Sequence, residues 1–131
     1  MVLTSACVLL GGLPTHAAET AESAVVKQLL QGFRTTRGVC AVLGIEDGKF
    51  VRELAQQSEF TLHVWEPREA AVQTARKLLD REQLHGTRVV VERGSYQRLP
   101  YADNSIDLVV AVRLTDSDLQ TLTATEVLRV L

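Results

Sequence analysis

Short apolar runs alternate with helical stripes along this chain, and that alternation constrains its fold more than any other feature. The run at residues 39–43 (Val-Cys-Ala-Val-Leu) contains no polar residue and lies between Gly38 and Gly44. An apolar run without polar alternation is typical of a strand buried on both faces, as in a parallel sheet. Further strands are predicted at residues 61–65, 88–91 and 107–112.

Between these runs the apolar residues recur with the period of a helix. The first stripe, over residues 21–33, has the i, i+3, i+4, i+7 spacing and consists of Val25, Val26, Leu29, Leu30 and Phe33. Later helices are predicted after Asp47 and Gly48, from Pro67 to about Gln83, and from an N-cap at Asp116 or Ser117 through Leu119, Leu122 and Val127. Strands that alternate with helices indicate right-handed βαβ units, and therefore an α/β fold with a parallel sheet.

Composition narrows the class of protein. The chain has 131 residues, of which 46% are hydrophobic and 23% are charged, and these values predict one folded domain. Its net charge of -2 provides no basic field, so we expect no nucleic-acid partner. No apolar run reaches the roughly 20 residues of a membrane span, so none is predicted. Cys7, Cys40 and the well-separated histidines predict neither a disulfide scaffold nor a metal site.

The N-terminal segment differs from the rest of the chain. Residues 2–13 are almost wholly apolar and are followed by the small residues Ala17 and Ala18. This order resembles the core and the cleavage site of a secretory signal peptide, although no charged side chain precedes the apolar run. We therefore expect a signal peptide at residues 1–18 and a domain at residues 19–131. On that expectation the protein is exported or periplasmic. If the segment is instead a frayed apolar terminus or an incorrect start, the protein is cytoplasmic.

Two loops can be placed at the carboxyl edge of the predicted sheet, where open parallel sheets bind ligands. Gly44 and Gly48 begin and end the loop after the first predicted strand, and they suit either close approach of the backbone to a ligand or a plain tight turn. Glu66 ends the second strand. A carboxylate there accepts hydrogen bonds from ribose hydroxyls, or is simply solvated at the start of a helix. Taken with the glycine loop, Glu66 favours ribose binding.

The segment of residues 94–110, whose first part is a polar loop, is the third candidate at this edge. Leu99 and Tyr101 are suited to wall an apolar slot for a flat base, with the Ser95 hydroxyl at its edge. The same two side chains also suit the packing of a surface loop against the sheet. Only together with the other two loops does this segment favour a ligand site.

Four segments in order resemble the class I S-adenosylmethionine-dependent methyltransferases, of the methyltransferase type 11-like kind. Residues 99–110 (LPYADNSIDLVV) are similar to the family's Leu-Pro-aromatic block, and residues 42–50 (VLGIEDGKF) resemble its glycine-rich motif. Glu66 matches the acidic residue after its second strand, and residues 126–131 (EVLRVL) resemble the segment before its fifth strand. The resemblance covers about residues 25–131.

This resemblance implies a Rossmann-like parallel sheet with flanking helices, with four strands in the order 3-2-1-4 and the family's C-terminal strands lacking. It also implies S-adenosyl-L-methionine as cofactor and direct in-line transfer of its methyl group to an unknown acceptor, a small molecule or a protein. The cofactor-binding residues that it implies are Gly44, Asp47 and Gly48 for the methionine moiety, Glu66 for the ribose, and Ser95 and Leu99 for the adenine. Catalytic residues are not assigned.

Two positions depart from the family pattern. Val42 stands where the family usually has an acidic residue, and Glu46 stands at its middle glycine. A side chain at a position of close backbone approach obstructs a ligand. Both residues favour the alternative of a non-catalytic module that keeps the fold and has lost the cofactor. A nicotinamide-dependent oxidoreductase is less favoured, because Glu46 and Lys49 stand at glycine positions of its G-x-G-x-x-G motif.

The family's sheet has more strands than the four predicted here, and the sequence ends at Leu131, where the fifth would begin. We therefore expect a truncated or fragmentary member. Exported methyltransferase-like domains are found joined to larger partners such as quinoprotein-type β-propellers, and the N-terminal layout here is similar. The resemblance thus implies fusion to, or pairing with, another domain.

Overall fold

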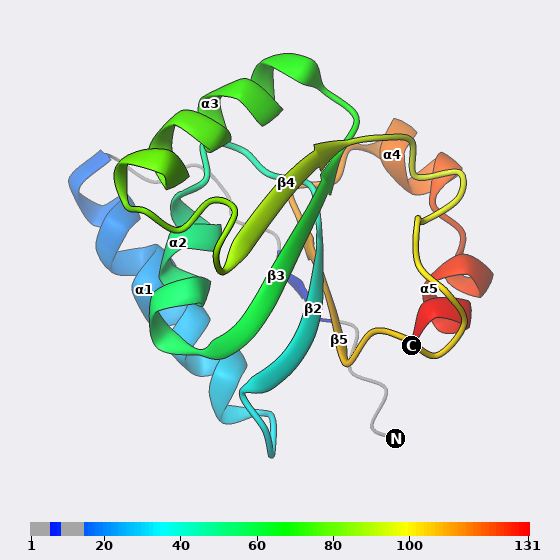
Figure 1. The fold of residues 1–131 in the computed structure, drawn as a ribbon, viewed down its shortest axis with the longest axis horizontal. Coiled ribbons are helices and arrows are strands. Elements are labelled where there is room, and N and C mark those ends of the chain that lie inside the picture. Colours follow the sequence, from blue (N-terminus) through cyan, green and yellow to red (C-terminus); the bar gives the residue numbers. More distant parts are fainter. Residues whose placement is uncertain (1–5, 9–14) are drawn as a thin grey trace.

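A parallel sheet with helices on both faces forms the centre of the protein (Figure 1). The computed structural model describes residues 6–8 and 15–131, with side chains from Ala21 onward. The strands are β1 (Ala6–Val8), β2 (Arg37–Leu43), β3 (Glu59–Glu66), β4 (Val89–Arg93) and β5 (Leu108–Val112). The helices are α1 (Thr15–Gln31), α2 (Lys49–Gln57), α3 (Glu69–Arg81), α4 (Asp116–Thr121) and α5 (Ala124–Val130).

The order of the strands is β1-β5-β2-β3-β4, and every pair of neighbours is parallel. Within this sheet, β4-β3-β2-β5 is the predicted 3-2-1-4 order, which is confirmed. The register sets Leu43 beside both Trp65 and Ala111, so β2, β3 and β5 reach the same edge of the sheet. The glycine loop and Glu66 therefore begin side by side at that edge.

Strand β1 lies within the predicted signal peptide. Ala6, Cys7 and Val8 form β1 and pair with Val110–Val112 at the free edge of β5. Residues 1–5 and 9–14 of the predicted signal peptide lie outside the described residues. The signal peptide at residues 1–18 stays a prediction.

Apolar side chains bury both faces of the sheet. Val26, Leu54 and Leu79, from α1, α2 and α3, belong to the cluster on one face. The cluster on the other face includes Leu99 and Val130, from the loop after β4 and from α5 (Figure 1). The central strands β2 and β5 are buried on both faces, which explains their unbroken apolar runs, whereas β3 and β4 expose alternate positions.

The C-terminal helical region differs from the single predicted helix. Thr115, not Asp116 or Ser117, is the N-cap of α4, because its hydroxyl accepts from the Asp118 N–H at 3.1 Å while the Asp118 carboxylate accepts from the Thr115 N–H at 2.9 Å. Leu122 is extended, with φ -81° and ψ 112°, and it ends α4. Thr123 then caps a separate helix, α5. Two capping threonines thus divide one apolar stripe into two short helices.

Two helix starts also differ from prediction. The first helix begins at Thr15, upstream of the predicted residues 21–33. α3 begins at Glu69 with Arg68 as its N-cap, so Pro67 lies just outside the helix instead of in its first turn. Among the described residues, no helix combines the length and the apolar character that a membrane crossing needs.

Candidate ligand-binding site

The loop between β2 and α2 passes very close to the end of β5. Gly44 has φ +88°, and a Cβ atom built on it would lie 2.3 Å from the backbone oxygen of Val112. Gly48 has φ +90° and caps α2 without a side-chain hydrogen bond. Since both positions have left-handed backbone, and position 44 also lacks space, the glycines are required by the loop itself. Asp47 completes the turn, with Oδ1 accepting from the Lys49 N–H at 3.1 Å.

Glu66 joins this loop to the start of α3. Its side chain is completely buried at the end of β3. Oε2 accepts from the Ile45 N–H at 2.9 Å, and Oε1 accepts from the Arg68 N–H at 2.8 Å. A buried carboxylate is stable only when it is hydrogen-bonded and paired with a positive charge. The two backbone N–H groups supply hydrogen bonds.

The Arg68 side chain supplies the positive charge and two further hydrogen bonds to Glu66. Its Nε donates to Glu66 Oε1 at 2.6 Å and its Nη2 donates to Oε2 at 3.2 Å. Hydrogen bonding to Glu66 raises the pKa of the Arg68 guanidinium, so this group stays charged. Arg68 Nη2 also lies 3.6 Å from Asp118 Oδ2, which gives the guanidinium a second carboxylate partner. Because the Arg68 side chain is 48% exposed, it covers Glu66 from the solvent side.

An unpartnered hydroxyl lies close to this ion pair. The Tyr96 side chain is buried, and its hydroxyl has no hydrogen-bond partner among the described residues. Burial first, and then the nearby Glu66 and Asp118 carboxylates, raise the pKa of Tyr96, while the nearby Arg68 guanidinium acts in the opposite direction. A buried hydroxyl without a partner is uncommon, and Tyr96 lies in the same core cluster as Leu99.

A hollow of about 340 Å³ opens beside the loop and Arg68. This volume is within the range of small-molecule sites. Its walls are Ile45, Glu46, Arg68, Ala71, Val112 and Arg113. The Glu46 carboxylate, at the predicted obstruction, forms an ion pair with the Arg113 guanidinium. The side chain at position 46 is therefore held by a partner and half exposed, with 47% of it accessible.

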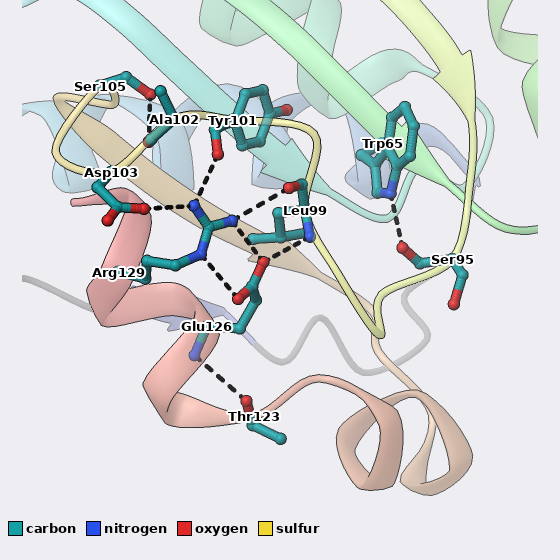
Figure 2. Close-up of polar contacts among 10 residues, drawn as sticks. All are labelled: Trp65, Ser95, Leu99, Tyr101, Ala102, Asp103, Ser105, Thr123, Glu126 and Arg129. Atoms are coloured by element: carbon teal, nitrogen blue, oxygen red, sulfur yellow. Dashed lines mark hydrogen bonds and ion pairs between the residues drawn. The ribbon is translucent and has the colours of Figure 1, made fainter.

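The loop after β4 has a different role for each of its two predicted adenine contacts. Ser95 is exposed, and its carbonyl oxygen accepts from Trp65 Nε1 at 2.9 Å (Figure 2). Leu99 is 1% exposed and packs in the core cluster, and it does not line the hollow. The structure therefore brings Gly44, Asp47, Gly48 and Glu66 together and leaves Leu99 inside the core.

α5 holds the Leu99–Tyr101 segment through one arginine (Figure 2). Arg129 donates to the carbonyl oxygens of Tyr101 at 2.8 Å and Leu99 at 3.2 Å. It also donates to Glu126 at 2.6 Å and Asp103 at 2.8 Å. Glu126 in turn accepts from the Leu99 N–H at 2.7 Å. Hydrogen bonding to Arg129, with help from Leu99, lowers the pKa of Glu126 to about 2.

Cys40 and His63 lie outside the candidate site. Burial raises the pKa of the Cys40 thiol to about 12, which keeps it protonated and unreactive. His63 lies between Tyr101 and Glu92, with its Nε2 2.9 Å from Glu92 Oε2. In the part of the chain that the structure describes, no group of three or more potential ligands could hold a metal ion.

Sequence reasoning missed Arg68, Arg113 and Tyr96. Arg68 had a local signal, since a basic residue two positions after a strand-end carboxylate is near enough to pair with it. Arg113 contacts Glu46 across 67 residues of chain, and no local pattern predicts such a contact. Tyr96 was part of the third loop, but its burial depends on tertiary packing.

Comparisons with known proteins identify the family and the fold. Residues 42–131 match the family described as methyltransferase domain. No curated protein matches the chain. Among solved structures, a protein of Methanococcus maripaludis assigned as an S-adenosyl-L-methionine-dependent methyltransferase is 23% identical, with a TM-score of 0.75 over 86% of this chain and 51% of its own.

Two further structures share the fold. The cyclase SpnF is 20% identical, with a TM-score of 0.69 over 88% of this chain and 42% of its own. Phosphoethanolamine N-methyltransferase 2 of Haemonchus contortus, in complex with S-adenosyl-L-methionine, is 18% identical, with a TM-score of 0.59 over 70% of this chain and 20% of its own. The chain thus spans about half the length of the first of these proteins and less of the other two. By the family match over residues 42–131, the chain belongs to the methyltransferase domain family.

Proposed function

We propose that the chain binds S-adenosyl-L-methionine at the carboxyl edge of its sheet and is the cofactor-binding part of a methyltransferase. The observation that carries this proposal is the buried Glu66 carboxylate beside the glycine loop and the open hollow. In this arrangement Gly44, Asp47 and Gly48 contact the methionine part of the cofactor, and Glu66 accepts from the ribose hydroxyls. Ser95 lies on the loop proposed to border the adenine.

The residues fit this group if one ion pair opens. The Arg68 side chain and two backbone N–H groups already donate to both oxygens of Glu66. A ribose hydroxyl can therefore donate to Glu66 only after the Arg68 guanidinium has moved away. The Asp118 carboxylate, 3.6 Å from Arg68 Nη2, offers the guanidinium another partner.

When it is bound, S-adenosyl-L-methionine supplies a methyl group on a positively charged sulfonium. The part of this chain is to hold and orient that group, because alignment of two reactants contributes a large share of such a rate enhancement. The loop backbone and Glu66 come from adjacent parallel strands, so they hold the two halves of the ligand in a fixed relation. We assign no base, and the acceptor remains an unidentified small molecule or protein.

A non-catalytic module is the second candidate, and a specific observation favours it. Arg68 satisfies both oxygens of Glu66, and Arg113 holds the Glu46 side chain in the hollow. If these ion pairs persist in solution, the fold remains and the ribose acceptor is blocked. SpnF, a cyclase, is a reminder that this fold alone does not determine the reaction.

We further propose, from the sequence pattern, that residues 1–18 form an export leader. On this proposal residues 19–131 form the methyltransferase-like domain, which works fused to or paired with another domain.

Calorimetric titration with S-adenosylhomocysteine, the product form of the cofactor, tests the proposed function. The 131-residue chain is compared with Glu66→Gln and with Glu59→Gln, which changes an exposed carboxylate at the opposite end of the same strand. We expect saturable binding that Glu66→Gln weakens by about tenfold to a hundredfold, as for the loss of charge-assisted hydrogen bonds. Glu59→Gln should leave the affinity unchanged. Circular dichroism checks that each variant is folded.

Arg68→Ala separates the two candidate functions. If Arg68 is a displaceable cover, its removal frees Glu66 and strengthens binding severalfold. If the chain is a non-catalytic module, the folded wild-type protein does not bind the compound, and cofactor binding by this chain is rejected.

A further inference from the structure

Glu22 of α1 is a buried carboxylate with no evident structural purpose. Glu22 is only 8% exposed. Its Oε2 atom is buried and has no hydrogen-bond partner among the described residues. Its neighbour Ser23 anchors this part of α1 to α2, since Gln57 Nε2 donates to Ser23 Oγ at 3.0 Å. Burying a carboxylate oxygen without a donor destabilises the folded chain, so the position calls for an explanation.

The carboxylate lines a small cavity on the glycine loop. The cavity has a volume of about 10 Å³, and Glu22, Glu46, Asp47, Gly48 and Phe50 are among its walls. This is room for about one water-sized group. A primary ammonium group has that size and carries three N–H donors, so it fits both the space and the unused acceptor.

The charges around this cavity also favour a cation. Burial, and then the nearby Asp47, raise the pKa of Glu22, and Glu46 acts in the same direction. Lys49 and Arg52 act in the opposite direction, but more weakly than burial and Asp47. A group that placed a positive charge in this cavity would relieve the repulsion among the carboxylates and hydrogen-bond Oε2.

We propose that Glu22 binds the primary ammonium group on the amino-acid part of the bound ligand. This inference rests on the proposed function and extends it, because it assigns a binding residue from α1, outside the loops at the sheet edge. α1 then covers the glycine loop and supplies the charged contact, while the loop backbone supplies the shape of the cavity.

Paired ligands test this role by calorimetry on the 131-residue chain. One ligand is S-adenosylhomocysteine, and the other is the same thioether with a hydrogen in place of its amino group. We expect the wild-type chain to bind the first more tightly by about tenfold to a hundredfold. Glu22→Gln should remove most of that difference by weakening only the first ligand. Glu59→Gln, a matched change of an exposed carboxylate, should preserve the difference.

The amino-free ligand also reports folding, because its affinity should be the same for the wild-type chain and Glu22→Gln. Equal weakening of both ligands would assign Glu22 a structural role and overturn the inference, as would a Glu22→Gln variant that binds both like the wild type. In either case the proposed function stands, because the wild-type chain still binds S-adenosylhomocysteine. A folded wild-type chain that binds neither compound overturns both proposals.

Discussion

Gly44 is the residue at which the backbone of the site has least freedom. Its φ of +88° lies in the left-handed region, and the Val112 carbonyl oxygen occupies the space that a Cβ atom would need. Left-handed backbone disfavours a side chain, and a clash with backbone atoms cannot be relieved by a rotamer change. The loop can therefore lie against the end of β5 only with glycine at this position.

Gly86 offers a matched comparison, since it has φ +79° and no atom lies within 4 Å of the place that a Cβ would take there. Gly86→Ala should reduce the free energy of unfolding by about 1 kcal/mol, the cost of a left-handed alanine. Gly44→Ala should reduce it by a further 1 to 3 kcal/mol or so, because the clash adds to the same backbone cost. Urea denaturation measures both values. Equal losses in the two variants would contradict the close approach of the loop to β5.

Residue-level prediction from the sequence was strongest where a signal is local. Glu66 follows directly on an apolar run, so its place at the sheet edge could be predicted. Glu22 could not, because its burial results from the packing of α1 against α2 and the glycine loop. Leu99 was predicted beside the ligand, but its alternative role as a packing residue describes its position in the core. An apolar residue in a loop has no local signal that separates these two roles.

At the scale of elements, α5 determines the path of the chain before β5. Its Arg129 contacts two backbone carbonyl groups and two carboxylates, and Glu126 accepts the Leu99 N–H (Figure 2). The loop has little regular structure of its own, so these contacts take the place of a hydrogen-bond ladder.

Glu126→Gln tests this role through its pH dependence. The folded-state pKa of about 2 is below the ordinary value of 4.5, so Glu126 stabilises the fold fully above pH 4.5 and loses that effect as the pH falls towards 2. At neutral pH, the free energy of unfolding of this variant should be about 1 to 2 kcal/mol lower than that of the wild-type chain. This deficit should shrink on acidification. Urea denaturation across this pH range measures it, with Glu82→Gln, an exposed residue at the C-cap of α3, as the control. A deficit independent of pH would contradict the ionic role.

The element boundaries show what sequence periodicity can and cannot predict. The sequence predicted β2 to β5 within a few residues. The central strands β2 and β5 are buried on both faces and leave an unbroken apolar signal, and β3 leaves an alternating one. The same periodicity merged α4 and α5, since Leu119, Leu122 and Val127 fit one helical stripe. The break lies in the backbone of Leu122 and in the caps Thr115 and Thr123, whose role depends on geometry.

At the scale of the whole molecule, the parallel sheet places the candidate site at one edge and the helices on the two faces. The order of β4, β3, β2 and β5 sets the glycine loop and Glu66 on neighbouring strands. Ile45 of that loop and Arg68, just after Glu66, therefore line one hollow although they are far apart in sequence. The alternation of elements along the chain predicted the fold class, and the resemblance to the methyltransferase family implied this strand order. The pairing of β1 with β5 was not predicted, since three residues carry too weak a pattern.

The most direct measurement is a nuclear magnetic resonance titration of the isotope-labelled chain with S-adenosylhomocysteine, following the backbone amide signals. We predict saturable shifts centred on Ile45 and Arg68, whose N–H groups bind Glu66, and on Gly48 of the loop. The amide of Val130, the last residue of α5, should not move, because its side chain packs in the core on the other face of the sheet. A folded chain whose spectrum does not change, or whose shifts centre on α5, would contradict a cofactor site at the carboxyl edge of the sheet.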